Sequence, residues 1–356
     1  MRLRPLLSSL AARSGQLGSV DYLEYFLTGP YVGTKVPCLF LVFPPGVQNP
    51  GVDLESDQLY GAVLAYEYRV CGFDTKIYIT DDDGGERTVL AVSAVRPRIA
   101  ARVAENLVHR GARLVLMTVR SEHAPAKEAM QLPAGRRKKS MSWTSRERQT
   151  RRYLTLQSTY DETLATLGKH TRRNLRSFRR RVESELQAVF LPLVTIPTEE
   201  FVTLNRSCSY PVPDRIAVWR HETAAQLEGG FIMGVRSADG RWLSLLGGRR
   251  HHGTTEVAWQ MNLEDHDELS LGTVMRSYLI EHEVGLGMNR LFFEGGTPHS
   301  MQSAFTSDTV VDILVSGRSV PAAFLRRHAP RLLPPKNILS EMLRDGELTW
   351  VPERAN

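Results

Sequence analysis

The sequence predicts a protein of the α+β or α/β class, built as two similar halves, each a mixed, mostly antiparallel sheet flanked by helices. The chain has 356 residues, which is about the length of two domains. Strand-like segments alternate with amphipathic helical segments. In addition, residues 111–116 and 287–293, about 176 positions apart, each place a glycine and an apolar strand after a helix. Together these observations indicate duplicated halves.

Composition excludes several classes of protein. Hydrophobic residues make up 42% of the chain and charged residues 24%, which is typical of a packed globular protein. No apolar run approaches the roughly 18 residues of a membrane span. The three cysteines are scattered, which excludes a disulfide framework and predicts a reducing, cytoplasmic location. Residues 1–14 lack the apolar core of a secretory signal, and we favour an ordinary terminus over an arginine-bearing transit peptide.

The first half is predicted to contain strands, a hairpin and one helix. The expected elements are a strand at 38–43, a hairpin formed by 76–80 and 88–92, a helix at 98–110 that ends at Gly111, and a strand at 113–118. Residues 121–150 are polar, contain prolines and carry a run of four cations, so we expect an exposed loop there.

A short strand at 153–156 leads into an arginine-rich helical segment. Thr159 and Glu162 have the spacing of a capping box, and Gly168 interrupts the helix that they begin. Beyond Gly168, apolar residues recur every three or four positions and predict one buried stripe: Leu175, Phe178, Val182 and Leu186. Arginines occupy the other faces of this helix.

Positive charge is concentrated in this part of the chain. Residues 136–181 hold fifteen lysines and arginines and three acids, a net charge of +12, whereas the whole chain has +6. Such a local field attracts phosphates or an acidic partner, and salt weakens that attraction. A solvated helix face with counter-ions is the simpler alternative.

The last third has the pattern of an antiparallel meander followed by a helix and a strand. The expected elements are helices at 199–208 and 214–227, strands at 231–235, 242–247 and 256–261, a linker at 263–268, a helix at 274–284 and a strand at 290–294. Residues 321–356 read as an appended tail with a short helix at 337–345.

The start of the 274–284 helix is a candidate phosphate site. Ser270 can cap the helix, and Gly272 lets a ligand approach the backbone because it has no β-carbon. The free N–H groups of a first helical turn attract a pyrophosphate, and Arg276 can add a charge-assisted contact. The alternative is a capped turn without a ligand.

These segments resemble the core of GNAT-fold acyltransferases: strand 256–261, the turn Ser270–Thr273, helix 274–284 and the strand between Gly287 and Gly296. Residues 154–156, 160–168 and 170–176 also resemble tandem-GNAT proteins of the FemAB and CelD-like kind, and the likeness covers roughly residues 60–320. It implies two GNAT-like halves joined by the arginine-rich helix. The implied parts are a degenerate half at 15–150, a connector at 151–190, a working half at 191–320 and a tail at 321–356.

The resemblance implies an N-acyltransferase that moves an acyl group from acyl-CoA, such as acetyl-CoA, to an amine, with no metal. The donor would be held by Ser270, Leu271, Gly272, Thr273 and Arg276. The candidate catalytic residues are Glu256, Glu294 and His299. We expect Gln260 on the same face of its strand as Glu256, and Trp259 on the opposite face in the core.

Two alternative functions remain open. One is a FemAB-like transferase that uses aminoacyl-tRNA as donor. The other is an inactive GNAT-fold module that binds nucleic acid or an acidic protein. For tRNA or an acidic carrier protein, the expected contacts are Arg172, Arg173, Arg176 and Arg180. A metal site at the adjacent His251 and His252 with His221 is disfavoured, because neighbouring histidines in a turn cannot easily share one ion.

Overall fold

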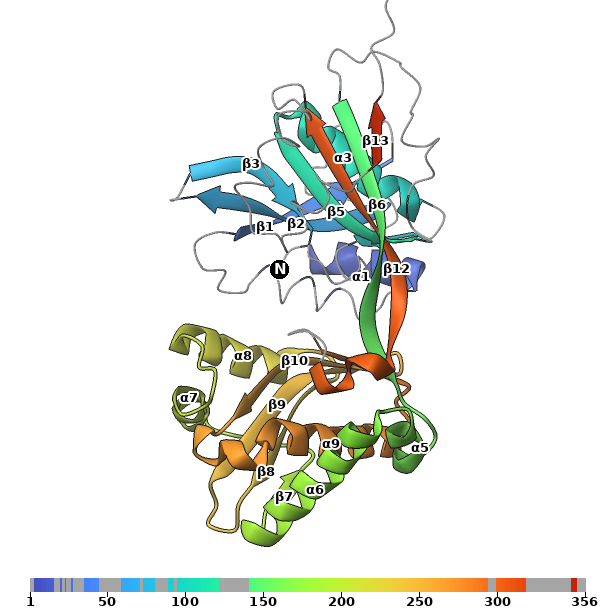
Figure 1. Ribbon diagram of the computed structural model, residues 1–356. Helices are drawn as coiled ribbons and strands as arrows, with labels where there is room; N and C mark the ends of the chain where they lie inside the picture. The colour runs from blue at the N-terminus through green and yellow to red at the C-terminus, as the bar shows by residue number, and fades with distance from the viewer. Residues whose placement is uncertain are drawn as a thin grey trace, which may run out of the picture. The chain divides into compact units, whose positions relative to one another are not determined.

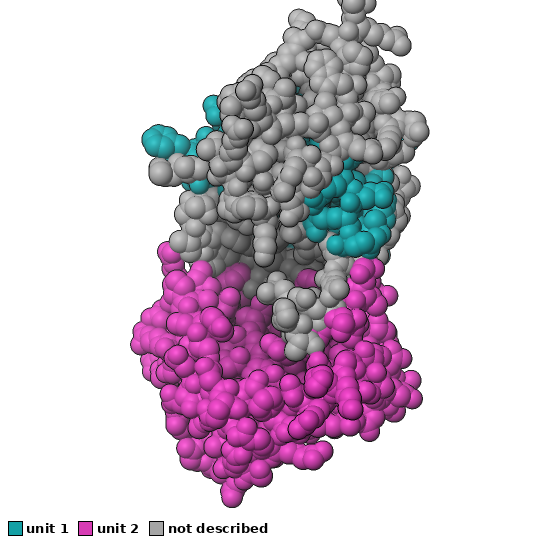
Figure 2. All heavy atoms as spheres, in the orientation of Figure 1, with its two compact units in different colours: residues 1–150, 308–356 teal, residues 151–307 magenta. Residues whose placement is uncertain are grey.

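The computed structural model divides the chain into two compact units, residues 1–150 with 308–356 and residues 151–307 (Figure 2). The residues that it describes are 3–15, 20, 23, 27, 35–44, 59–70, 73–80, 89–92, 95–121, 124, 141–293, 299–317 and 347–350. Figure 1 labels most of the elements within these ranges. None of the helices in them is long and apolar enough to cross a bilayer.

The first unit contains a mixed sheet whose strands follow the order β1-β2-β3-β5-β12-β6. Only β3 and β5 run parallel among its registered pairs, and β4 and β13 add to β2 and β6. The elements are α1 (Arg4–Ser14), β1 (Lys35–Val42), β2 (Gly61–Val70), β3 (Phe73–Ile79), β4 (Val89–Ala91), α3 (Arg96–His109), β5 (Leu114–Arg120), β13 (Glu347–Trp350) and parts of β6 (Met141–Thr155) and β12 (Phe305–Gly317).

Alternating side chains of β2 explain how two helices cover this sheet. Val63 lies in the core beneath α3, whereas Ala62 and Leu64 lie in a second core that includes Leu7 and Leu10 of α1. Successive strand residues point to opposite faces, so β2 contributes to both layers. Among the described helices, α3 therefore covers one face of this sheet and α1 the other.

The second unit has the strand order β6-β11-β10-β9-β8-β7, with only β10 and β11 parallel. Its elements are the end of β6, α5 (Tyr160–Ala165), α6 (Lys169–Glu185), β7 (Val189–Leu191), α7 (Thr198–Arg206), α8 (Asp214–Gln226), β8 (Gly230–Arg236), β9 (Trp242–His251), β10 (Thr254–Asn262), the 3₁₀ helix η3 (Glu264–Leu269), α9 (Leu271–Gly285), β11 (Arg290–Phe293) and the 3₁₀ helix η4 (His299–Ala304). Helix α9 packs on β9, β10 and α6, whereas α8 packs on α7, β8 and β9.

The same order of elements recurs in the two units, as the internal repeat predicts. In each, a helix is followed by a glycine with positive φ, Gly111 at 102° and Gly287 at 72°, and then by a strand. That strand, β5 or β11, runs parallel to an earlier strand, β3 or β10. The prediction of two halves with mixed, mostly antiparallel sheets flanked by helices is confirmed.

The capping box and the buried stripe are also confirmed. The Thr159 hydroxyl accepts the N–H of Glu162 at 3.2 Å, and the Glu162 carboxylate accepts the N–H of Thr159 at 3.1 Å. Helix α5 ends before Gly168, and α6 begins after it. The whole predicted stripe of α6 meets the core of the second unit, with Leu175 and Val182 buried and Phe178 and Leu186 partly buried.

Two predictions for the first unit are wrong. Strands β3 and β4 do not pair with each other as a hairpin. Instead both pair with β2, β4 with its first residues and β3 with its last, so they lie one after the other along this longer strand. Residues 141–150 are strand rather than exposed loop, because β6 extends to Thr155 and pairs with β13. The predicted helix at 337–345 and the cation run at 136–139 lie outside the described residues.

Candidate functional site

Strands β10 and β11 form the parallel pair of the second unit. Their registered pairs run from Thr254–Arg290 to Val257–Phe293, and Phe293 is the last residue of β11 that the structure describes. Beyond Val257, β10 continues to Asn262 with β9 as its registered partner.

A β-bulge lies in the second half of β10. The β9–β10 register shifts between Val257 and Trp259, which leaves Ala258 unpaired. Two glycines in β9 make room for it: a β-carbon at Gly247 would lie 2.1 Å from the Trp259 ring, and one at Gly248 would lie 1.9 Å from the Glu256 carbonyl oxygen. Larger residues could not occupy these positions without displacing β10.

The bulge reverses the expected faces of β10. Trp259 packs edge-on against Phe201 of α7, on the same face as Glu256, whereas Gln260 donates to the Gly272 carbonyl of α9 at 3.3 Å. The prediction that Gln260 shares the face of Glu256 and that Trp259 opposes it is therefore wrong. Strict alternation fails here because one extra residue shifts the pattern.

Helix α9 follows β10 after the short 3₁₀ helix η3. Ser270 is the N-cap residue, with φ 50°, but its side chain makes no cap bond to the backbone; its hydroxyl instead lies 2.9 Å from that of Thr273. The backbone N–H groups of Thr273 and Val274 bond to the Ser270 carbonyl. Within the described part of the chain, Leu271 and Gly272 keep unbonded N–H groups, as the first residues of a helix do.

Side-chain donors converge on Gly272. A β-carbon at this position would lie 3.2 Å from Asn262 Nδ2, 3.5 Å from Gln260 Nε2 and 3.7 Å from Arg276 Nη2. The Asn262 oxygen already accepts bonds from Gln260 and Ser244, which turns its NH₂ group toward Gly272. Sequence reasoning missed Asn262 because its role depends on the bulge.

Arg276 contributes an unpaired positive charge. Among the described residues it has no ion pair, and its Nε is buried without a hydrogen-bond partner. Burial lowers the pKa of Arg276 from its usual value, because desolvation disfavours the charged form. An anionic or carbonyl oxygen beside Gly272 would satisfy this guanidinium.

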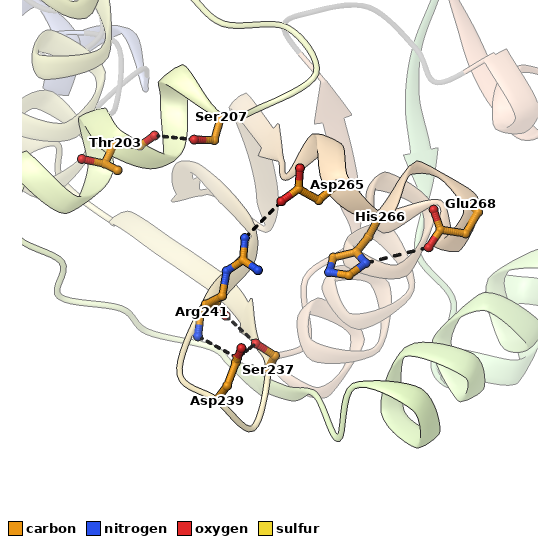
Figure 3. A network of polar contacts seen from close by, with 8 residues as sticks. All are labelled: Thr203, Ser207, Ser237, Asp239, Arg241, Asp265, His266 and Glu268. Carbon is orange, nitrogen blue, oxygen red and sulfur yellow. Dashed lines mark hydrogen bonds and ion pairs between the residues drawn. The ribbon is translucent and has the colours of Figure 1, made fainter.

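Acidic side chains surround the turn that precedes α9. Asp265 forms an ion pair with Arg241 at 3.2 Å, and His266 lies 3.8 Å from Glu268 (Figure 3). Ser209 donates to Asp267 at 3.2 Å. These contacts occupy the carboxylates of Asp265, Asp267 and Glu268. They do not involve the donors around Gly272.

Glu256 lies on the other face of β10 and is paired with Phe292 of β11. It is 5% exposed; Arg249 Nε donates to its Oε2 at 2.7 Å, and His251 Nε2 lies 3.3 Å from its Oε1. His251 and His252 have ring centroids 5.2 Å apart. No group of three potential metal ligands occurs in the described residues.

The structure does not describe the side chains of the other two candidate catalytic residues. Glu294 lies outside the described residues, directly after β11. His299 is the first residue of η4, but its side chain is not described. The candidate site therefore consists of the end of β10, the first turn of α9 and Glu256.

A second charged feature lies on α6. Lys169, Arg172, Arg173 and Arg180 form no ion pair with any described residue, whereas Arg176 pairs with Asp161 at 2.6 Å. These five cations and Ser177 line one open hollow of about 460 Å³. The arginines predicted to contact a polyanion thus share one face of one helix.

No protein-family model and no curated protein sequence matches the chain. Solved structures match its fold. L-PGS from Bacillus licheniformis has a TM-score of 0.51 and 11% identity, and the match covers 86% of this chain and 90% of that one. The C-terminal domain of a putative lysylphosphatidylglycerol synthetase from Agrobacterium fabrum has a TM-score of 0.51 and 9% identity, covering 86% and 92%.

A tandem GNAT protein from the clavulanic acid biosynthesis pathway, solved without AcCoA, matches with a TM-score of 0.43 and 13% identity, over 86% of this chain and 96% of that one. At such identities a likeness concerns the fold and leaves the reaction open. The chain shares its fold with the L-PGS structure and with the lysylphosphatidylglycerol synthetase domain. Its second half contains the helix start, at α9, that the sequence analysis gives as a candidate phosphate site.

Proposed function

We propose that the chain is an acyltransferase that moves an acyl group from an acyl-CoA thioester to an amine. The observation that carries this proposal is the group of donors without partners at the start of α9. The unpaired Arg276 and the free N–H groups of Leu271 and Gly272 suit the donor's diphosphate. We place the pantetheine arm of the donor along the last residues of β10.

The reaction needs no covalent enzyme intermediate. The acceptor ammonium loses a proton, the amine nitrogen forms a bond to the thioester carbon, and the carbon–sulfur bond breaks. The thiolate then takes up a proton. Glu256, which is paired with Phe292 in the β10–β11 register, is our first choice to accept the amine proton directly or through water, with Arg249 and His251 as positioning residues. Glu294 and His299 are the other choices.

The donor site is tested by replacing Gly272 with tryptophan and measuring CoA and acetyl-CoA binding by calorimetry. The indole would displace Asn262, Gln260 and Arg276, so we expect affinity to fall by at least about 100-fold. Gly285→Trp is the matched control, because Gly285 ends the same helix with no atom close to its missing β-carbon. Absence of CoA binding by the unaltered protein would reject the proposed donor.

The role of Glu256 is tested by Glu256→Gln, which keeps an acceptor for Arg249. We expect kcat for transfer from acetyl-CoA to a panel of amines to fall about 100-fold or more, while the affinity for CoA stays unchanged. Full activity of this variant would exclude Glu256 as the base and leave Glu294 and His299.

The α6 surface favours a second candidate, in which the donor is aminoacyl-tRNA. Four cations without an ion pair on one helix face are an electrostatic footprint for a phosphate backbone. An acidic carrier protein would use the same charges. RNA binding through this face should weaken steeply with salt, whereas CoA binding at α9 should depend less on it.

This candidate is tested with unfractionated tRNA in filter-binding assays at several salt concentrations. The variant Arg172→Glu, Arg173→Glu, Arg180→Glu should lose binding and reduce the salt dependence, whereas Arg215→Glu on α8 should change both little. Equal tRNA affinity of the triple variant and the unaltered protein would reject the α6 surface as an RNA site. RNA binding without transfer from any donor would favour the inactive module.

A further inference from the structure

We propose that Tyr210 stacks on the nucleobase of the donor, which makes it a specificity-determining residue of the site at α9. The inference rests on the proposed acyl-CoA donor. Tyr210 is 88% exposed, more than any other large apolar side chain among the described residues. Single exposed aromatic residues are common on protein surfaces, so its meaning depends on how the chain around it is held.

Hydrogen bonds fix the loop that carries Tyr210. Asn205 is 1% exposed and brackets Val212, because its amide donates to the Val212 carbonyl at 2.8 Å and accepts the Val212 N–H at 3.2 Å. At the start of the loop, the Ser207 hydroxyl donates to the Thr203 carbonyl (Figure 3). The loop therefore presents the ring with little backbone freedom left to lose when a ligand binds.

The same loop is joined to the donor site. The N–H of Ser209 bonds to the carbonyl of Asn262 at 3.1 Å, and its hydroxyl bonds to Asp267 at 3.2 Å. Asn262 is the residue whose amide faces Gly272, and Asp267 accepts the N–H of Ser270. Tyr210 is the next residue after Ser209, so the backbone that carries its ring lies beside the turn that leads into α9.

The chemistry of a CoA donor assigns this position to adenine. The pantetheine arm of the donor lies along β10 in the proposed site and its diphosphate at the first turn of α9, so the base lies beyond the phosphates, on the outer side of that turn. Aromatic side chains stack on any base, because every base has a π-face. An exposed ring on a fixed loop is suited to that role.

The test compares CoA with 4′-phosphopantetheine, which keeps the arm and one phosphate but has no adenine. We expect Tyr210→Ala to weaken CoA binding about tenfold, as measured by calorimetry, and to leave 4′-phosphopantetheine binding unchanged. Tyr210→Phe keeps a ring and should bind CoA as the unaltered protein does. Leu193→Ala, which removes another exposed apolar side chain of the same unit, is the control.

The outcomes separate this inference from the proposed function. If the unaltered protein binds CoA and Tyr210→Ala binds it equally well, or if both ligands weaken alike, base stacking is rejected and the donor site stands. If the unaltered protein binds neither ligand, the donor site is rejected and the inference with it.

Discussion

At the scale of residues, two carboxylates from adjacent elements show how the second unit uses buried charge. Glu256 and Glu283 lie on opposite faces of the sheet, because their arginine partners, Arg249 and Arg250, are successive residues of β9. Glu283 is fully buried and accepts Arg250 Nε and Nη2 at 2.7–3.1 Å, together with the Thr255 hydroxyl. Both carboxylates are thus held in buried ion pairs. We assign Glu283 to stability, whereas Glu256 is the residue that we propose as the base.

Replacing Glu283 with glutamine should destabilise the protein substantially. Breaking one side of a buried ion pair typically costs about 3–5 kcal/mol, and because Arg250 is 21% exposed we expect about 2–3 kcal/mol here. Urea denaturation followed by circular dichroism measures the loss. Asp265→Asn, which breaks the exposed Arg241–Asp265 pair, should cost less than about 1 kcal/mol. Equal losses of stability for the two variants would contradict the larger contribution that we expect from the buried ion pair.

At the scale of elements, the β9 glycines decide the shape of the site. Gly248→Ala would place a β-carbon against the backbone of Glu256, so β10 would have to move. We expect a loss of about 2 kcal/mol or more in stability, together with weaker CoA binding. Gly285→Ala in α9 has open space and should be neutral or slightly stabilising. A tolerated Gly248→Ala would show that the bulge needs no glycine opposite it.

The contact between α6 and α9 should depend on pH through Glu183. Desolvation alone would raise the pKa of Glu183, but hydrogen bonds from Arg179 at 2.9 Å and Tyr278 at 2.8 Å outweigh it and leave that pKa below its usual value. A lowered folded-state pKa adds stability above the unfolded pKa of about 4.3, and this is lost as the pH falls through the folded value.

Comparison of the unaltered protein with Glu183→Gln tests whether stability is lost in this direction of pH. We expect the difference in unfolding free energy to be largest above about pH 5 and to vanish in more acidic solution, as seen in denaturation curves across pH. Glu185→Gln, which affects only the exposed pair with Arg181, is the control. A difference that grows on acidification would show that Glu183 is protonated more easily when folded.

Local patterns were enough to predict most elements but not the faces of β10. The capping box at Thr159 and the stripe of α6 depend on neighbours within a few residues, so the sequence shows them directly. The bulge at Ala258 depends on Gly247 and Gly248 in another strand, and it moves Gln260 and Asn262 toward α9. Pairing of β4 with β2 instead of β3 is equally non-local.

At the scale of the whole molecule, the two units share an order of elements but differ where a donor would bind. In the first unit the Thr80 hydroxyl accepts the N–H of Thr118 at 2.9 Å and thereby bridges β3 and β5 beyond their registered pairs. Helix α3 has proline in its first turn, which removes a backbone donor, and the Arg96 guanidinium bonds to the carbonyls of Ala91 and Ser14.

These differences predict one donor site per chain. Calorimetric titration with CoA should give a stoichiometry near one, and Gly272→Trp should abolish all binding rather than half of it. In the described part of the first unit, Thr80 bridges β3 and β5, and proline stands in the first turn of α3. Thr80→Val, which removes the bridging hydroxyl but keeps a similar shape, should leave the stoichiometry unchanged, because proline still occupies the start of α3. Two sites per chain, or binding retained in Gly272→Trp, would mean that the first unit also holds a donor.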